Sequence, residues 1–174
     1  RIRVQLDAIH GGIAELKADG IKANFADTES GNALNDYLYF VGENPKDAQV
    51  NGQVTIKPRD KGPLVASLLV TSEAPGCWNL EREVRVVADG DYVELLNTVD
   101  KRRLEAQNYH EAKESLNFAF PLNVPNGTIR LDVPLGVMRP EEDQIASACK
   151  NWFTVGRWAD VANDDYGATW VTLD

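Results

Sequence analysis

Apolar and polar residues alternate along many short stretches of this chain, whereas helical spacing is almost absent. In residues 1–6 every second side chain is apolar, a pattern that predicts a strand with one buried face. Residues 80–88 and 92–99 show the same alternation and flank Asp89-Gly90-Asp91, a sequence typical of tight turns between strands. We therefore predict a β-hairpin over residues 80–99.

Strand propensity and alternation predict further strands at residues 13–16, 37–41, 50–57, 64–71, 115–122 and 128–133. Pro58 is expected to end the predicted strand at 50–57, because proline cannot donate to a ladder. Residues 101–114 have a helix-like composition but a poor apolar stripe, so we expect a loop with at most a short helical turn. We also expect a loop at residues 135–143.

The last quarter of the chain, residues 150–174, contains three of the four tryptophans. Two strand-like runs flank a polar turn at residues 162–167, where Asn, Asp and Gly tolerate positive φ angles. Bulky residues fall on both faces of the first run, which predicts a strand covered on both sides. The segment is therefore either a core hairpin or an aromatic-rich pocket wall around Arg157 and Asp160.

About eleven or twelve short strands with almost no helix indicate an all-β fold, a large antiparallel sandwich. No internal linker or repeat divides the chain, so we expect residues 1–174 to form a single β-sandwich domain. The chain starts at Arg1 without a methionine and ends directly after a strand-like run. We expect it to be a fragment of a larger multidomain enzyme.

A net charge of −9 argues against nucleic acid and anionic membranes as partners, because both attract positive surfaces. Neutral ligands such as sugars are compatible with this charge. No apolar run approaches the length of a transmembrane helix. The compartment is not fixed by the sequence, and a periplasmic or secreted location is slightly favoured over a cytoplasmic one.

Motifs for several common chemistries are missing from the sequence, including phosphate-binding glycine loops and nucleophile elbows. His10 and His110 are the only histidines, which argues against a histidine-rich zinc site within this chain. Cys77 and Cys149 form one disulfide or are both free. The acidic runs at 141–143 and 164–165 are interpreted as solvated loop charge.

Aromatic residues with polar neighbours are the remaining candidates for chemistry, because sugar rings stack on aromatic side chains while their hydroxyls need polar partners. Most large rings fill the core of a β-sandwich, so we expect most of these to be structural. An arginine is rarely buried without a partner, which makes Arg139 and Arg157 functional candidates if they are buried. The aromatic candidates are Tyr37, Tyr39, Trp152, Trp158 and Trp170.

Several segments occur in one order along nearly the whole chain: GGIAELKADG, NALNDYLYF, KGPLVASLLV, EVRVVADGDYVELLNTVD, KESLNFAFPLNVPNG, LDVPLGVMRPEEDQ and NWFTVGRWADVANDDYGATW. As a set they resemble the C-terminal β-sandwich region of glycoside hydrolase family 38, the α-mannosidases. The resemblance implies a galactose-mutarotase-like supersandwich, which agrees with the strand count.

In that family the nucleophilic aspartate and the zinc ligands lie upstream of the sandwich, and none of their motifs occurs in this chain. The resemblance therefore implies no cofactor here, zinc in the catalytic domain of the parent, and the catalytic and helical domains of the same parent chain as partners. The family's sandwich lends a tyrosine and an arginine to the carbohydrate substrate. Tyr37 matches the tyrosine, and Arg139 is the best match for the arginine, with Arg157 as the fallback.

The resulting hypothesis is a non-catalytic domain of a retaining, metal-dependent α-mannosidase that supports the catalytic domain and is inactive alone. The alternative is a stand-alone carbohydrate-binding or mutarotase-like module. A mutarotase needs a catalytic histidine and glutamate on one concave sheet, and only His10 and His110 are available. A third possibility is a sandwich that mainly packs on its partner domains, which would leave an exposed apolar patch.

Overall fold

The computed structural model describes residues 1–42, 44, 46–105, 108 and 113–173. Within these residues every regular element is a β-strand, and all strand pairs are antiparallel, which confirms the all-β prediction. The strands group into two compact units, Arg1–Pro121 and Leu122–Asp174. We call them the first and second units and describe each by itself.

The first unit contains three sheets, with strand orders β1-β2, β4-β3-β9 and β5-β6-β7-β8. Its strands are β1 (Ile2–Leu6), β2 (Ile13–Ala18), β3 (Asp36–Val41), β4 (Gln49–Val50), β5 (Thr55–Lys61), β6 (Val65–Ser72), β7 (Cys77–Val87), β8 (Val93–Lys101) and β9 (Glu114–Ala119). The hairpin predicted at residues 80–99 is confirmed as β7 and β8, and Asp89 adopts a φ of 60° in its turn.

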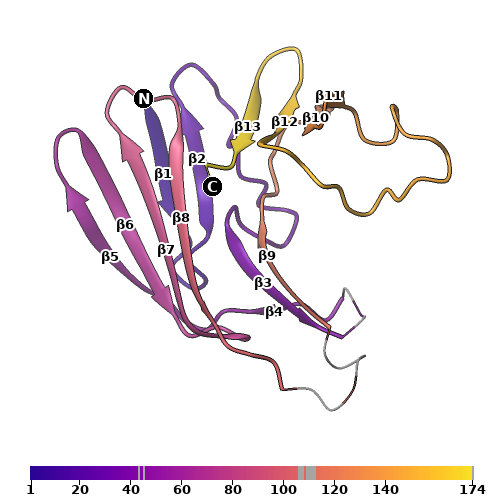
Figure 1. Cartoon of the computed structure of the whole chain (residues 1–174). Helices are drawn as coiled ribbons and strands as arrows, with labels where there is room; N and C mark the ends of the chain where they lie inside the picture. Colours follow the sequence, from indigo (N-terminus) through magenta and orange to yellow (C-terminus); the bar gives the residue numbers. More distant parts are fainter. Residues whose placement is uncertain (43, 45, 106–107, 109–112, 174) are drawn as a thin grey trace. The chain divides into compact units, whose positions relative to one another are not determined.

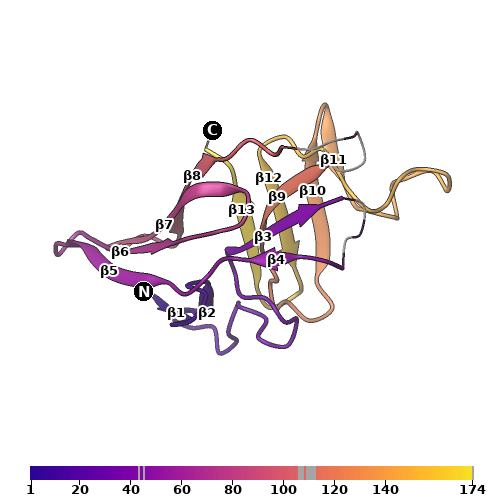
Figure 2. The same ribbon diagram turned by 90° about the horizontal axis from the view of Figure 1, so that it is seen from below.

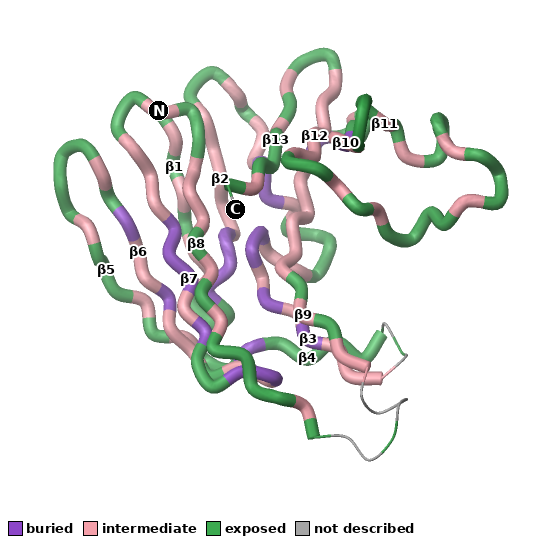
Figure 3. Tube along the Cα trace, in the orientation of Figure 1, coloured by how far each residue is buried: buried purple, intermediate pink, exposed green. Residues whose placement is uncertain are grey.

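The β1–β2 hairpin lies over one face of the four-stranded sheet (Figures 1 and 2). On β7, Leu80, Arg82 and Val84 share one face and are all buried, as the sequence alternation predicts. Figure 3 shows further buried stretches at the start of β2 and at the start of β3. The core of the first unit therefore forms where these segments meet β7.

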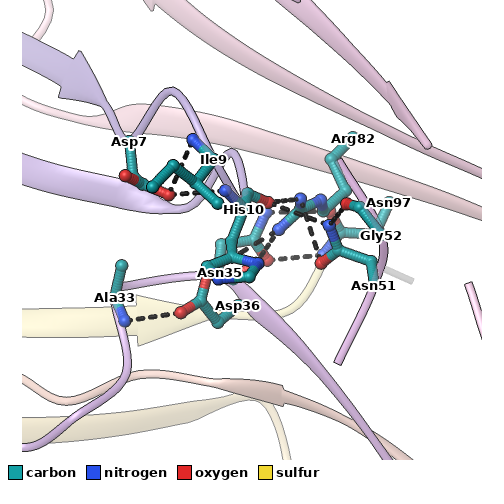
Figure 4. Close-up of polar contacts among 10 residues, drawn as sticks. All are labelled: Asp7, Ile9, His10, Ala33, Asn35, Asp36, Asn51, Gly52, Arg82 and Asn97. Carbon is teal, nitrogen blue, oxygen red and sulfur yellow. Dashed lines mark hydrogen bonds and ion pairs between the residues drawn. The ribbon is translucent and has the colours of Figure 1, made fainter. Parts of the chain in front are cut away.

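Arg82 joins these segments through its buried guanidinium, which is only 1% exposed. It donates to the carbonyl oxygen of Asn35 at 2.8 Å and to that of His10, and its third contact is Asn51 Oδ1 at 3.4 Å (Figure 4). Asp36 lies 4.0 Å away. We call Arg82 with His10, Asn35, Asp36, Asn51 and Asn97 the Arg82 cluster.

The second unit is one sheet of order β11-β10-β12-β13. Its strands are β10 (Thr128–Val133), β11 (Gly136–Met138), β12 (Trp158–Ala162) and β13 (Gly167–Val171). Cross-strand neighbours in antiparallel sheets share a face. One face therefore carries Arg130, Asp160 and Thr169, which are joined by hydrogen bonds to the Asp160 carboxylate.

Some predicted boundaries are wrong. No single strand covers 50–57, because β4 ends at Val50 and β5 runs through Pro58. Pro58 is tolerated because β5 is an edge strand, where one side of the backbone needs no partner. The loop expected at 135–143 contains the short strand β11. The expected loop at 101–114 includes residues 106–107 and 109–112, which lie outside the described residues. His110 is one of them.

Gly11 is a crowded position in the β1–β2 turn and offers a direct test of the packing around Arg82. Its φ is +75°, and an added Cβ would lie 2.5 Å from Val70 Cγ1 and 3.0 Å from Arg82 Nη2. Gly20 has a similar φ of +87° but nothing within 4 Å of its added Cβ. The two glycines thus share the backbone constraint and differ in crowding.

We predict that Gly20→Ala lowers the free energy of unfolding by about 1–2 kcal/mol, the cost of a left-handed alanine. Gly11→Ala should cost about 1–3 kcal/mol more, because the methyl group also overpacks the core. Urea unfolding of both variants measures the difference. Equal losses for the two variants would show that the Gly11 turn is not packed against Val70 and Arg82.

Candidate functional site

Tyr37, the tyrosine singled out by the sequence, lies in the core of the first unit with no exposed surface. Its ring meets Phe118 edge to face, with centroids 5.9 Å apart. Its hydroxyl donates to the carbonyl oxygen of Pro75 at 2.5 Å. Burial raises the pKa of the Tyr37 phenol, so the group stays a protonated donor.

Tyr39 lies two residues further along β3 and is also buried. Its hydroxyl donates to Glu114 Oε2, and Lys101 Nζ donates to the same oxygen at 2.7 Å. Burial, together with the bond to Glu114, raises the pKa of Tyr39 to about 12. The Lys101 and Tyr39 hydrogen bonds lower the pKa of Glu114, so this carboxylate remains ionised beside the phenol.

The turn at residues 72–77 covers these two tyrosines and is fixed by its own backbone. Gly76 has a φ of +75°, and an added Cβ would collide with the ring of Tyr39. The Gly76 carbonyl accepts from Arg102 N at 2.9 Å, and the Glu73 carbonyl accepts from Gly52 N at 3.0 Å. The tyrosines, the turn and the segment after β8 thus form one connected structure.

Trp78 projects from the end of this turn and is 68% exposed. The Arg102 guanidinium lies over its ring, 5.4 Å from the centroid. Both side chains line a hollow of about 470 Å³, which we call the Trp78 hollow. Its lining residues are Val50, Gly52, Glu73, Ala74, Pro75, Cys77, Trp78 and Arg102.

Sequence reasoning missed Trp78 because the predicted strand starts at residue 80, whereas β7 starts at Cys77. Extended back to residue 78, simple alternation would place Trp78 on the buried face with Leu80 and Arg82. The β7–β8 register shifts between Cys77 and Asn79. Such an irregularity redirects side chains, and here Cys77 is buried while Trp78 points to solvent. An indole directly after a glycine-containing turn is the only sequence signal that could have marked it.

Arg139, the best sequence match for the sugar-binding arginine, lies in the second unit and is exposed. Its guanidinium pairs with Glu142 at 2.8 Å and with Asp143 at 3.0 Å. Its backbone N–H donates to Asp143 Oδ2 at 2.7 Å. The pairing with Asp143 raises the pKa of Arg139 and lowers that of Asp143.

Arg157, the fallback, is also exposed and in the second unit. Its N–H donates to Asp132 Oδ2 at 2.7 Å, and its carbonyl accepts from Thr172 N at 2.9 Å. Neither arginine meets the burial condition that would have favoured it, and the buried arginine is Arg82 instead. Tyr37 belongs to the first unit, so neither unit by itself brings all three predicted residues together.

The remaining candidates divide between core and surface. Tyr39 is buried, Trp158 is half-buried, and Trp152 is 79% exposed, which contradicts a core role for Trp152. Cys77 and Cys149 are free thiols. Among the described residues, no three His, Cys, Asp or Glu side chains gather closely enough to hold a metal ion. In the same residues, no helix has the length and apolar character needed to cross a bilayer.

Comparison with protein families matches residues 25–173 to the C-terminal domain of glycosyl hydrolases family 38. The chain belongs to this family. The resemblance inferred from the sequence motifs is thereby confirmed. Comparisons with curated proteins and with solved structures found no significant match. The likeness to galactose mutarotase stays a prediction for this family 38 domain.

The Tyr39–Glu114 bond predicts a specific pH dependence. The pKa of Tyr39 rises from 10.0 to about 12 on folding, so its stabilisation is complete below pH 10 and is lost as the pH rises toward 12. Tyr39→Phe should lower the free energy of unfolding by about 1–3 kcal/mol at neutral pH, because the bond is charge-assisted. Above pH 10 the gap to the unsubstituted chain should narrow.

Urea unfolding at pH 7, 9, 10.5 and 11.5 measures this gap, and Tyr92→Phe is the matched control because Tyr92 is 50% exposed. The control should change stability little at any of these pH values. A gap for Tyr39→Phe that stays constant to pH 11.5 would contradict the assigned bond.

Proposed function

We propose that this chain is the non-catalytic domain of a retaining, metal-dependent α-mannosidase, in which it supports the catalytic domain and lends residues to the sugar site. The observation that carries this proposal is the family 38 match over residues 25–173. Because the match extends through both units, we also propose that residues 1–174 act as one β-sandwich domain. Its partners are the catalytic and helical domains of the same parent chain, with a carbohydrate as substrate.

Zinc is assigned in this proposal to the catalytic domain of the parent. Among the described residues of this chain, no three His, Cys, Asp or Glu side chains gather closely enough to hold a metal ion. The chain's own contribution is to position and bind the sugar. The groups proposed for this role, the Tyr37 hydroxyl and the Arg139 guanidinium, are hydrogen-bond donors. Neither is proposed as a nucleophile or a general acid.

Tyr37 would contribute a hydroxyl that stays protonated because burial raises its pKa. It now donates to Pro75 O, so contact with a sugar hydroxyl requires the turn at 72–77 to yield that bond. Arg139 would contribute a charge-assisted donor. Its two carboxylate partners, Glu142 and Asp143, hold the guanidinium at the surface until a ligand replaces them.

The chain by itself is predicted to be inactive. With zinc present, the purified 174-residue chain should not hydrolyse an aryl α-mannoside, whereas the intact parent should hydrolyse it and lose activity with a chelator. Zinc restored after chelation is the control for the parent. Turnover by the isolated chain, at the same rate in independently purified batches, would overturn the proposal that this domain is non-catalytic.

The choice between the two arginines is tested in the intact parent with Arg139→Ala and Arg157→Ala. We predict that Arg139→Ala lowers kcat/KM on the order of 100-fold, as expected for a donor to the reacting sugar. Arg157→Ala is the matched control, since both arginines are exposed and in the same unit. The reverse result would assign the role to Arg157, and unchanged kinetics in both would contradict an arginine from this domain.

A further inference from the structure

The Trp78 hollow combines the features of a binding site for a single sugar ring. We propose that it binds one uncharged hexose unit of a glycan, stacked on Trp78. This inference deepens the proposed function, on which it rests, by adding a subsite whose lining includes none of Tyr37, Arg139 and Arg157. The occupant is a neutral carbohydrate.

The indole of Trp78 supplies the stacking surface. Trp78 is 68% exposed at the start of β7, although large rings are normally highly buried. Arg102 lies 5.4 Å from the ring centroid and restrains the orientation of the ring. Most of the indole surface remains available to the C–H face of a sugar, which is apolar.

The other walls of the hollow supply polar groups for sugar hydroxyls. Glu73 offers a carboxylate acceptor and Arg102 offers guanidinium donors. These two side chains carry opposite charges, so the lining has no net charge, which suits an uncharged ligand better than an anion or a cation. The volume of about 470 Å³ is in the lower part of the range for small-ligand sites.

The backbone of the hollow is fixed before any ligand arrives. Hydrogen bonds tie Gly52 N to Glu73 O, Arg102 N to Gly76 O and the Tyr37 hydroxyl to Pro75 O. Three separate segments of the first unit therefore hold the walls in place. A preformed site of this kind loses little conformational entropy on binding.

The direct test is a titration of the 174-residue chain with a linear mannotriose, followed by the indole N–H resonances of its four tryptophans. The Trp78 resonance, assigned through Trp78→Phe, should shift with a dissociation constant on the order of 1 mM, whereas the Trp152 resonance should not move. Trp78→Ala should weaken binding at least about 10-fold. Glu73→Gln should weaken it about 3-fold or more.

Trp152→Ala is the matched control, because Trp152 is 79% exposed and lies outside the hollow. It should bind as the unsubstituted chain does, and thermal melting should confirm that every variant is folded. Retained binding in Trp78→Ala would overturn the subsite, as would the absence of any shift of the Trp78 resonance with mannotriose and with the gluco- and galacto-configured trisaccharides described below. The subsite would also be overturned if Trp78→Ala weakened only the association with the parent's catalytic domain.

Repeating the titration with gluco- and galacto-configured trisaccharides separates this inference from the proposed function. Binding of one of these at Trp78, with no binding of mannotriose, would keep a sugar subsite while contradicting a mannosidase parent. Conversely, an active parent mannosidase whose isolated C-terminal chain binds none of the three would overturn the subsite alone.

Discussion

The packing of the first unit depends on the hydrogen bonds of one buried group, the guanidinium of Arg82. Desolvation of this charge lowers the pKa of Arg82, and such a cost is tolerated only when the donors find acceptors. The two Nη groups find the backbone carbonyls of His10 and Asn35, whereas Nε has no hydrogen-bond partner among the described residues. Asp36, at 4.0 Å, is too far for a tight ion pair, and burial raises its own pKa. The cation is therefore held chiefly by oriented peptide dipoles from two segments distant in sequence.

The Arg82 cluster also orients the strand that carries the candidate tyrosines. Asn35 adopts a φ of 65° and exchanges two side-chain hydrogen bonds with Asn97 on β8. Asp36 accepts from Ala33 N at 2.7 Å. Tyr37 follows directly in the chain. The hydrogen bonds of Asn35 and Asp36 therefore help to orient the backbone from which the Tyr37 ring projects. A residue matched to a sugar site thus depends on a cluster that contains none of the predicted site residues.

Local patterning predicted the strands well, because alternation and turn residues act over a few positions. The β7–β8 hairpin and the strand at residues 128–133 are examples. Alternation even placed Arg82 on the apolar face, but its partners near residues 10, 35 and 51 depend on long-range packing that no local pattern encodes. Trp78 was missed because the predicted strand started at residue 80, and local alternation does not reveal the register shift beside Trp78. Tyr37 was found by family resemblance, whereas its complete burial depends on the turn that covers it.

The exposed side chains of the Trp78 hollow are held in place by buried contacts beneath the turn at residues 72–77. Trp78 and Arg102 lie at the surface, yet the turn that presents Trp78 is positioned by the ring of Tyr39 beneath Gly76 and by the hydroxyl of Tyr37 on Pro75. Each of these contacts lies on the side of the turn opposite to solvent. A change in the tyrosines therefore reaches the hollow through the backbone of the turn and through Cys77, which lines the hollow and belongs to the same core cluster as both tyrosines. The core of the first unit and its candidate binding surface lie on two sides of the same turn between β6 and β7.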